Sequence, residues 1–316
     1  MADINITRTD AGALINPEVS REIVQAVVEN SAALRLMRRL PNLATNVREY
    51  PILDSFPIAG FVDGDTGLKP TTTVKWKKDY IRVAEIAAII VVPDSIAADS
   101  DYDIFGQLRP RLEEAAGRVI DSAIFFGENK PSDWPTGIVT AATTAGNTVT
   151  QSADVFKDIF GVGGLISKVE EDGYFPTTIA SAIGMRATLR GLTDNNKRPL
   201  FLENMQQGAN YTLNGMSMDF PRNGAWKADQ ALMLTGDWQQ AVYAMRQDVT
   251  FNIYDTGVIS DENGKVLVNL MQQDSKAIRM VIRMGWNVLN PLNALNPDGS
   301  TRFPFAVYAP SGASGN

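Results

Sequence analysis

The stretch from Tyr102 to Ile138 constrains the fold most, because it predicts one long helix with a defined end. Its apolar residues recur in steps of three and four, which is the spacing of one buried helix face. These residues are Phe105, Leu108, Leu112, Ala115, Val119, Ala123 and Phe126. Gly127 predicts a left-handed stop, and Pro110 predicts either the start of the regular helix or a kink in it. Counted from Pro110 alone, the helix would be roughly 25 Å long.

Three polar residues ahead of this helix, Ser100, Asp101 and Asp103, are candidates to cap its start. The charged residues within it are Arg109, Arg111, Glu113, Glu114, Arg118 and Asp121. Because their signs alternate, they are expected to form a solvated face opposite the apolar one. The pattern therefore favours a structural rod over the wall of a catalytic cleft.

The chain has 316 residues, with no histidine and no cysteine. This composition removes the commonest general base near neutral pH, the common zinc ligands, thiolate nucleophiles and the Ser-His-Asp triad. Carboxylate, lysine or serine-lysine chemistry stays open, although no arrangement of these residues stands out. The sequence therefore predicts no catalytic residue, no cofactor and no metal, and it disfavours an enzyme without excluding one. Without disulfides, stability must come from packing and association.

Hydrophobic residues make up 44% of the chain, enough for a substantial core in one large domain or two. The net charge of −7 disfavours a dedicated nucleic-acid binder, because neutralising phosphates requires clustered cations. Residues 1–10 hold no signal-peptide core, and the longest apolar run, Ile86 to Val92, is too short to cross a bilayer. A soluble protein made in a cytoplasm is expected.

Residues 1–45 are predicted to be an N-terminal arm, and residues 46–92 an extended β-hairpin. In the arm, Asn16 predicts the start of one helix, and Ser31 predicts the start of a second short helix that ends at Pro41. The hairpin combines an extended segment up to Phe61, a turn cluster at 63–67 and a long β-branched strand at 71–92. Its base, from Ile86 to Val92, is apolar and should enter a core. An isolated hairpin is barely stable in water, so a partner surface is implied.

Residues 151–255 are predicted to form an α/β unit. A helix is predicted over 155–169, closing at Gly173, and a second helix over 185–192. Three short strands are predicted at 177–180, 231–235 and 241–245. Residues 93–150 and 256–300 form the region of the long helix. There Asn263-Gly264 predicts a tight turn, and strict alternation over 277–288 predicts a strand of roughly 40 Å. Residues 301–316 are predicted to be a C-terminal tail, which is Ala-, Gly- and Ser-rich and frayed after Pro304.

Two motifs resemble ligand sites but are better explained as structure. Asp63-x-Asp65-x-Gly67 resembles the opening of a calcium loop, yet Leu68 and Val74 stand where that loop needs glycine and glutamate. The run Gly161–Gly164 lies within a helical pattern and lacks the other residues of a phosphate-binding loop. A plain turn is preferred for the first motif, and close helix packing or a flexible joint for the second.

The densest cationic group is Arg35, Arg38 and Arg39 on the second arm helix. These arginines could contact nucleic acid, but a solvated helix face or salt bridges to a neighbour are preferred. Glu85 could be a buried carboxylate, although a position on the outer face of its strand, or a pair across a subunit contact, is the better explanation.

The order of these elements resembles the major capsid proteins of tailed bacteriophages, which have the Hong Kong 97-type fold. Residues 116–123, with Gly127 and the turn that leads to Ile138, resemble the family's spine helix and its exit. Residues 189–200 are similar to the helix and loop after the first strand of its axial domain. Residues 234–251 resemble the family's sequence of Gly-Asp, strand and hairpin. The resemblance covers nearly the whole chain, and it lies in the order of the motifs.

This resemblance implies an α+β fold with an N-terminal arm, an extended loop, a peripheral domain with a spine helix and an α/β axial domain. It implies a shell subunit that joins copies of itself in hexamers and pentamers of an icosahedral virion head. Such a head is assembled in the bacterial host's cytoplasm and encloses double-stranded DNA without sequence-specific binding. The hairpin and the arm would each contact a neighbouring subunit. The candidate contact residues are Arg35, Arg38, Arg39, Lys69, Lys75, Lys77, Lys78, Glu85, Arg109 and Arg118.

The implied partners are a portal and, in some members, decoration proteins; because the chain starts almost at the arm, scaffolding is expected from a separate protein. Some members crosslink a hairpin lysine to an asparagine of a neighbour. No residue here identifies that asparagine, so no crosslinking is predicted. Two alternatives stay open: an encapsulin-like cellular shell that would hold protein cargo, and a carboxylate-based hydrolase.

Overall fold

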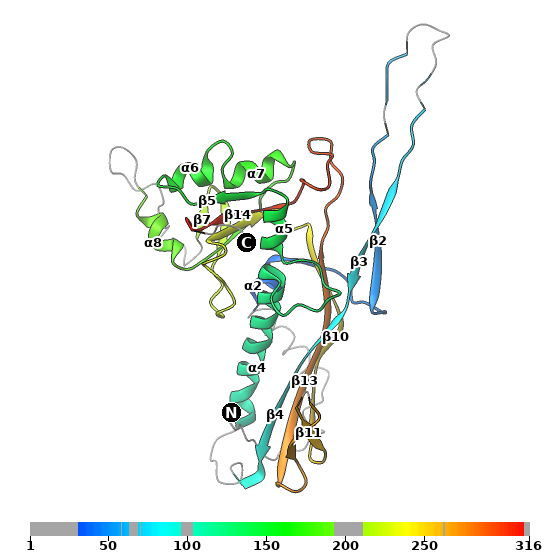
Figure 1. The fold of residues 1–316 in the computed structure, drawn as a ribbon, viewed down its shortest axis with the longest axis vertical. Coiled ribbons are helices and arrows are strands. Elements are labelled where there is room, and N and C mark those ends of the chain that lie inside the picture. Colours follow the sequence, from blue (N-terminus) through cyan, green and yellow to red (C-terminus); the bar gives the residue numbers. More distant parts are fainter. Residues whose placement is uncertain are drawn as a thin grey trace.

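The computed structural model describes residues 31–57, 59–62, 69, 71–95, 104–192, 211–261 and 263–312, with the backbone alone at 104–109. Figure 1 shows three parts: an α/β body, a long sheet beside the helix α4, and a hairpin that projects beyond both. The helix predicted at Asn16, the candidate caps of the long helix and the turn at 63–67 lie outside the described residues.

The predicted long helix is confirmed as α4 (Ile104–Asp121), with Pro110 inside it and not at its start. A π-helix, η1 (Ser122–Phe126), follows, and Gly127 forms the predicted stop at φ +74°. The chain then returns over the helix end, where a Cβ on Gly137 would lie 2.4 Å from the backbone nitrogen of Gly127. Glycine at 137 therefore permits this backbone contact, and α5 (Ile138–Thr144) begins directly after it.

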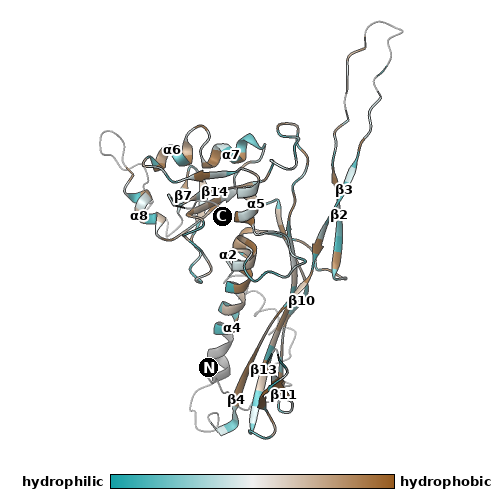
Figure 2. Cartoon of the chain, in the orientation of Figure 1, coloured by the Kyte–Doolittle hydropathy of each residue, from teal (hydrophilic) through white to brown (hydrophobic). Residues whose placement is uncertain are grey.

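The long sheet has four strands in the order β1-β10-β13-β4. These strands are β1 (Arg38–Arg39), β10 (Ala241–Tyr254), β13 (Ser275–Val288) and β4 (Ala84–Pro93). The predicted alternation over 277–288 is confirmed in β13. Its Met280, Ile282, Met284 and Trp286 belong to one core cluster with Ile120 of α4. Figure 2 shows the hydrophobic residues along β4 and β13 on which this packing depends.

The hairpin consists of β2 (Val47–Leu53) and β3 (Trp76–Arg82), paired antiparallel from Val47 with Arg82 to Leu53 with Trp76. The strand predicted over 71–92 is wrong as one element, because it changes partner at Val83: β3 pairs with β2, and β4 pairs with β13. The apolar base enters the core as predicted. Ile86, Ala88 and Ile90 pack against the main cluster.

The α/β body contains a six-stranded sheet in the order β5-β14-β9-β6-β8-β7. These strands are β5 (Thr148–Thr150), β14 (Phe305–Ala309), β9 (Met233–Gly236), β6 (Thr178–Ser181), β8 (Met216–Asp219) and β7 (Thr212–Leu213). The helices α6 (Val155–Phe160), α7 (Leu165–Glu171) and α8 (Met185–Arg190) contribute to a second core cluster with this sheet. The predicted strand at 177–180 and helix at 185–192 are thereby confirmed, each within two residues at its ends.

The prediction of a frayed tail is wrong for residues 305–309. β14 lies between β5 and β9, and each of its five residues is buried. The physical reason is the run Phe305–Ala309, whose only polar side-chain atom is the hydroxyl of Tyr308. Such a run is stable between two neighbouring strands, because both of its faces can be buried.

Two other elements differ from the prediction. The helix expected over 155–169 is two helices, because Gly161–Gly164 separates α6 from α7 and Gly163 has φ +73°. The strand expected over 241–245 extends to Tyr254 as β10, and it belongs to the long sheet with β13 and not to the sheet of the α/β body. β11 (Val258–Ser260) and β12 (Val266–Asn269) form the hairpin predicted at Asn263-Gly264.

The second arm helix is present but shorter than predicted. α2 (Ala32–Leu36) is capped by Ser31, whose Oγ accepts a hydrogen bond from the backbone N–H of Leu34. Arg38 and Arg39 lie beyond the helix, in β1, which pairs parallel with β10. The placement of these two arginines on a helix is therefore wrong, because edge pairing with β10 supplies the backbone hydrogen bonds that a longer helix would have made.

Candidate intersubunit surfaces

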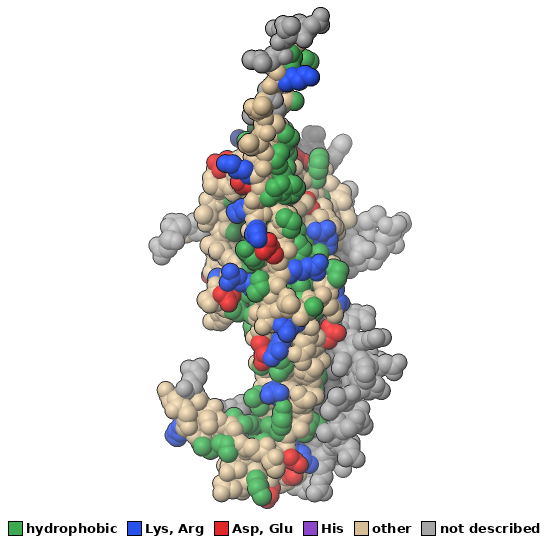
Figure 3. Space-filling view, turned by 90° about the vertical axis from the view of Figure 1, so that its right-hand side faces the viewer, with side chains coloured by type: hydrophobic (Ala, Val, Ile, Leu, Met, Phe, Trp, Pro, Cys, Tyr) green, Lys and Arg blue, Asp and Glu red, His purple; other side chains and the backbone are tan. Residues whose placement is uncertain are grey.

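The hairpin exposes large apolar side chains along its length. Trp76 is 67% exposed and Phe61 is fully exposed, and further apolar side chains on the same segment are exposed too. These are Phe56, Val62 and Val74. Figure 3 shows hydrophobic side chains where the hairpin rises above the body. A two-stranded ribbon with exposed aromatic residues has the chemistry of a contact surface, because a soluble monomer gains nothing from exposing them together.

The root of the hairpin is fixed tightly to β13. A Cβ on Gly285 would lie 2.5 Å from the carbonyl oxygen of Arg82, so the two backbones touch there. Asn287 donates two hydrogen bonds to the hairpin, to Asp79 Oδ1 (2.8 Å) and to the Tyr80 carbonyl oxygen (3.1 Å). Buried Ile81 packs beside these contacts with Val242 and neighbouring residues. The hairpin is thus held at one end and projects freely from it.

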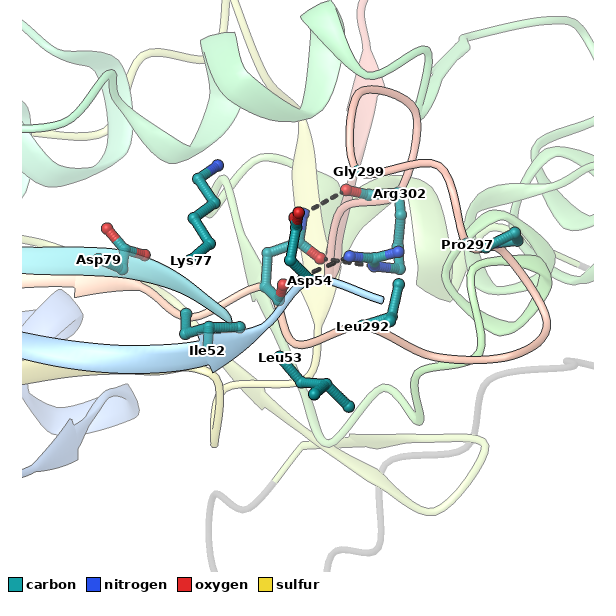
Figure 4. A pocket seen from close by; sticks show the side chains of 10 residues that line it. Ile52, Leu53, Asp54, Lys77, Asp79, Leu292, Pro297, Gly299 and Arg302 are labelled. Carbon is teal, nitrogen blue, oxygen red and sulfur yellow. Dashed lines mark hydrogen bonds between the residues drawn. The ribbon is translucent and has the colours of Figure 1, made fainter. Parts of the chain in front are cut away.

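A small cavity of about 110 Å³ lies at this root. Lys77 and Asp79 of the hairpin line it together with Leu292 and Arg302, and Figure 4 labels these side chains. Arg302 is buried and already donates to Asn290 Oδ1 (2.9 Å) and to the Asn296 carbonyl oxygen (2.7 Å). The cavity is smaller than the roughly 300–1,000 Å³ typical of ligand pockets. It is a gap beneath the hairpin and does not have the size of a cofactor site.

The four predicted hairpin lysines do not form one group. Lys78 pairs with Glu49 across the hairpin at 2.7 Å, and the hydrogen bond to Glu49 raises the pKa of Lys78 above its ordinary value. Lys77 lines the cavity, whereas Lys75 and Lys69 are exposed towards the tip. The exposed Trp76 lies between Lys75 and Lys77, so this part of the hairpin is both charged and apolar.

The arginine group predicted in the arm is divided. Arg35 pairs with Asp219 of β8 within the same chain. Arg38 is exposed, and Arg39 donates to Asn42 Oδ1 at 3.3 Å. The three arginines thus lie in different elements and have different surroundings, which does not favour one nucleic-acid site formed by all three. Their contact with a neighbouring subunit stays a prediction.

Of the remaining candidates, Glu85 lies on the outer face of β4 and accepts a hydrogen bond from Arg283 Nε of β13 at 2.7 Å. This agrees with the outer-face interpretation and gives Glu85 a partner in its own chain. Arg118 donates to the Asn223 carbonyl oxygen (2.8 Å) and lies 3.6 Å from Glu114. The side chain of Arg109 lies outside the described residues.

The solvated face predicted for α4 is wrong at Glu113 and Asp121, which are both buried. Asp121 accepts hydrogen bonds from Ser31, Ala32, Ala33 and Asn223. Burial raises the pKa of its carboxyl, and these four hydrogen bonds oppose that rise without cancelling it. The only signal in the sequence was position: Asp121 directly follows Ile120 and lies two residues before Ala123, near the end of the helix.

Within the described residues, no group of three or more acidic side chains could hold a metal ion. No described helix is both long and apolar enough to cross a membrane. What the geometry does present is an elongated molecule with a rooted, projecting hairpin whose exposed apolar residues need a partner. These features define a structural subunit of an assembly.

A family model assigns the class directly. The model described as the phage capsid family matches residues 11–296, and the chain therefore belongs to the phage capsid family. The fold is the Hong Kong 97-type fold that the order of the elements suggested. No curated protein matches the chain.

Solved structures agree with this assignment. A chain from Microbacterium phage Oxtober96 is 30% identical, with a TM-score of 0.78, over 89% of this chain and 91% of that chain. A chain from Mycobacterium phage Bobi is 26% identical, with a TM-score of 0.77, over 90% and 91% of the two chains. A third, from the capsid of a native GTA particle computed with C5 symmetry, is 14% identical with a TM-score of 0.60 over 98% and 95%, and it shows the fold alone. The protein is a phage capsid subunit that builds a head shell from copies of itself.

Proposed function

We propose that this capsid subunit assembles into hexamers and pentamers of an icosahedral head, with the hairpin of each copy lying across its neighbour. The observation that supports this most directly is the exposure of Trp76, Phe61 and Val74 on a two-stranded ribbon that is anchored only at its root. A head-to-tail contact of this kind closes a ring when it is repeated. The hairpin reaches away from the body, so it can cover a surface that its own chain does not present.

The segment before Ser31 is the second element that contacts a neighbour in this proposal. Further partners are a separate scaffolding protein and a portal, and decoration proteins on the outer surface. The shell encloses double-stranded DNA without reading its sequence, which is consistent with a net charge of −7 and with arginines that are dispersed over the fold. Assembly takes place in the cytoplasm of the bacterial host, and the subunit acts as a structural element with no catalytic role.

The contact made by the hairpin is tested by replacing Trp76 with serine. Losing one well-buried interface aromatic typically weakens a contact by about 2 kcal/mol or more, which is roughly 30-fold in affinity. The contact repeats around each ring, so the yield of shells should fall by at least about tenfold. The thermal midpoint of the unassembled chain should stay unchanged, because Trp76 is exposed within its own chain.

A matched control is Leu295→Ser, which removes a comparably exposed apolar side chain from the 290–302 segment and not from the hairpin. Shell yield is measured by electron microscopy and sedimentation at equal protein concentration. Normal shells from Trp76→Ser, or an equal loss of shells from both variants, would contradict the proposed role of the hairpin.

A further inference from the structure

Asp121 connects three segments that are distant in the sequence. Its carboxylate is fully buried at the end of α4. Oδ1 accepts from the Ser31 hydroxyl (2.5 Å) and the Ala33 N–H (3.0 Å), and Oδ2 accepts from the Ala32 N–H (3.0 Å) and the Asn223 side-chain amide (2.6 Å). Both oxygens of the carboxylate are therefore used.

The helix α2 depends on this carboxylate. A five-residue helix is not stable by itself, and the N–H groups of its first turn have no partner within the helix. The N–H groups of Ala32 and Ala33 are satisfied by Asp121 alone among the hydrogen bonds described for them. Since Ala33 and Leu34 are buried in the main core cluster, water does not replace a lost acceptor there.

The hydrogen bonds described for the carboxylate of Asp121 all come from neutral donors. The charged side chains nearby have other partners, and one of them holds the segment that contains Asn223. Arg118, one turn earlier on α4, donates to the backbone carbonyl of Asn223 and lies beside Glu114. On α2, Arg35 pairs with Asp219. The π-helix that starts at Ser122 directly follows Asp121, and π-helical turns are rare and frequently lie at functional sites.

We propose that Asp121 is a positioning residue for assembly: it fixes α2 against α4 and thereby fixes the place of Ser31, to which the segment that contacts a neighbour in the proposed assembly is joined. This inference rests on the proposed function in one respect, namely that the segment before Ser31 contacts a neighbour. α2 itself is part of the core of its own chain, so the carboxylate determines where that segment starts and not what it binds.

The test compares the full-length chain with Asp121→Asn by hydrogen exchange and by shell assembly. Asparagine at position 121 keeps the side-chain volume. Its NH2 group, however, takes the place of one carboxylate oxygen and would face N–H or O–H donors in place of accepting from them. Losing a buried hydrogen bond to a charged group should accelerate exchange at residues 32–37 by about 10- to 100-fold. Exchange in β10 and β13 should stay unchanged. Glu170→Gln is the control, because it neutralises an exposed carboxylate on α7 that contacts neither Asp121 nor the residues described as donating to it.

Two further variants keep the test decisive if Asp121→Asn folds poorly. Ser31→Ala removes one of the four donors and should give an intermediate acceleration. Combining Asp121→Asn with Asn223→Asp exchanges donor and acceptor between the two side chains. In this double variant the amide at 121 can donate to the new carboxylate at 223, which can still accept from the Ala225 N–H, so protection at 223–226 should be kept while exchange at residues 32–34 stays fast.

Shells are counted by electron microscopy in the same preparations, and Asp121→Asn is expected to lower their yield by at least about tenfold, in line with a contact weakened by one or more such bonds. Unchanged exchange at 32–37 in Asp121→Asn, or faster exchange with a normal yield of shells, would refute the inference alone. If the unaltered chain forms no shells under any assembly condition, the proposed function fails, and the exchange data still show whether Asp121 holds α2.

Discussion

Replacing Gly285 with alanine should loosen the hairpin at its root. Gly285 lies in β13 opposite Ala244 of β10, where the hairpin crosses the long sheet. An added Cβ would lie 2.5 Å from the Arg82 carbonyl oxygen and 2.9 Å from both the Arg82 carbonyl carbon and Ile81 Cγ2. Ordinary van der Waals contact begins at 3.4 Å, so the Arg82 backbone would have to move by about 0.9 Å.

The expected magnitude follows from two opposing effects. Overpacking against a backbone that cannot rotate away destabilises by about 1–3 kcal/mol. Replacing glycine with alanine also restricts the unfolded chain, which stabilises by about 0.4–1 kcal/mol. The net loss should be about 1–2 kcal/mol, which lowers the thermal midpoint of a chain of this size by roughly 1.5–3 °C.

The assay is thermal unfolding of the unassembled chain, combined with hydrogen exchange across β2 and β3. Exchange in the hairpin should increase, because the same displacement stretches the hydrogen bonds from Asn287 to Asp79 and Tyr80. Gly184→Ala is the matched control, since its backbone φ of −62° suits alanine and no atom lies within 4 Å of the added Cβ. An unchanged midpoint and unchanged hairpin exchange in Gly285→Ala would refute the reasoning.

Two further predictions concern the carboxylates of Asp158 and Glu85, each of which accepts hydrogen bonds from side chains of its own chain. Burial alone would raise the pKa of Asp158, but its hydrogen bonds from Ser152 and Tyr308 outweigh burial and hold the pKa below its ordinary value. The stabilisation by ionised Asp158 is therefore present above about pH 4 and lost as the pH falls below it. Tyr308→Phe should lower the free energy of unfolding by about 1 kcal/mol at pH 7. The difference in this free energy between the variant and the unaltered chain, measured by urea unfolding, should become smaller towards pH 3. Glu85→Gln should change the free energy of unfolding by less than about 0.5 kcal/mol, because its pair with Arg283 is half exposed; a loss above 2 kcal/mol would show that the pair is buried in solution.

Long periodic elements could be predicted from the sequence because each one carries its own signal. The helix before Gly127 and the strand over 277–288 have clear periods of 3.6 and 2, and both are present. β14 was missed for the opposite reason. Its five apolar residues are too few to show a period, and the residues after Pro310 suggested a tail. Only the neighbouring strands β5 and β9 make that run a buried strand.

The candidate surfaces were predicted less well than the fold, since burial of a polar residue depends on segments that are far away in the sequence. Asp121 looks like one more charge on a polar helix face. Its burial follows from Ser31 and Ala32, about ninety residues earlier, which fold against it. β10 was predicted too short because Arg246, Gln247 and Asp248 break the apolar pattern. The register of β10 with β13 shifts at those residues, so the strand accommodates them as irregularities and continues.

The contrast between the two ends of the molecule explains how a stable body can carry an incomplete surface. In the body, the buried carboxylate of Asp172 is satisfied internally: it accepts from Asn147, Asn296 and the backbone of Phe303. The hairpin has two strands, exposed aromatic residues and one anchored end. A two-stranded ribbon is marginal in water, so its free energy is lowered mainly by what covers Trp76 and its neighbours. In the proposed assembly a second copy of the chain covers these residues as the shell forms, and ordering of the hairpin would then be coupled to assembly.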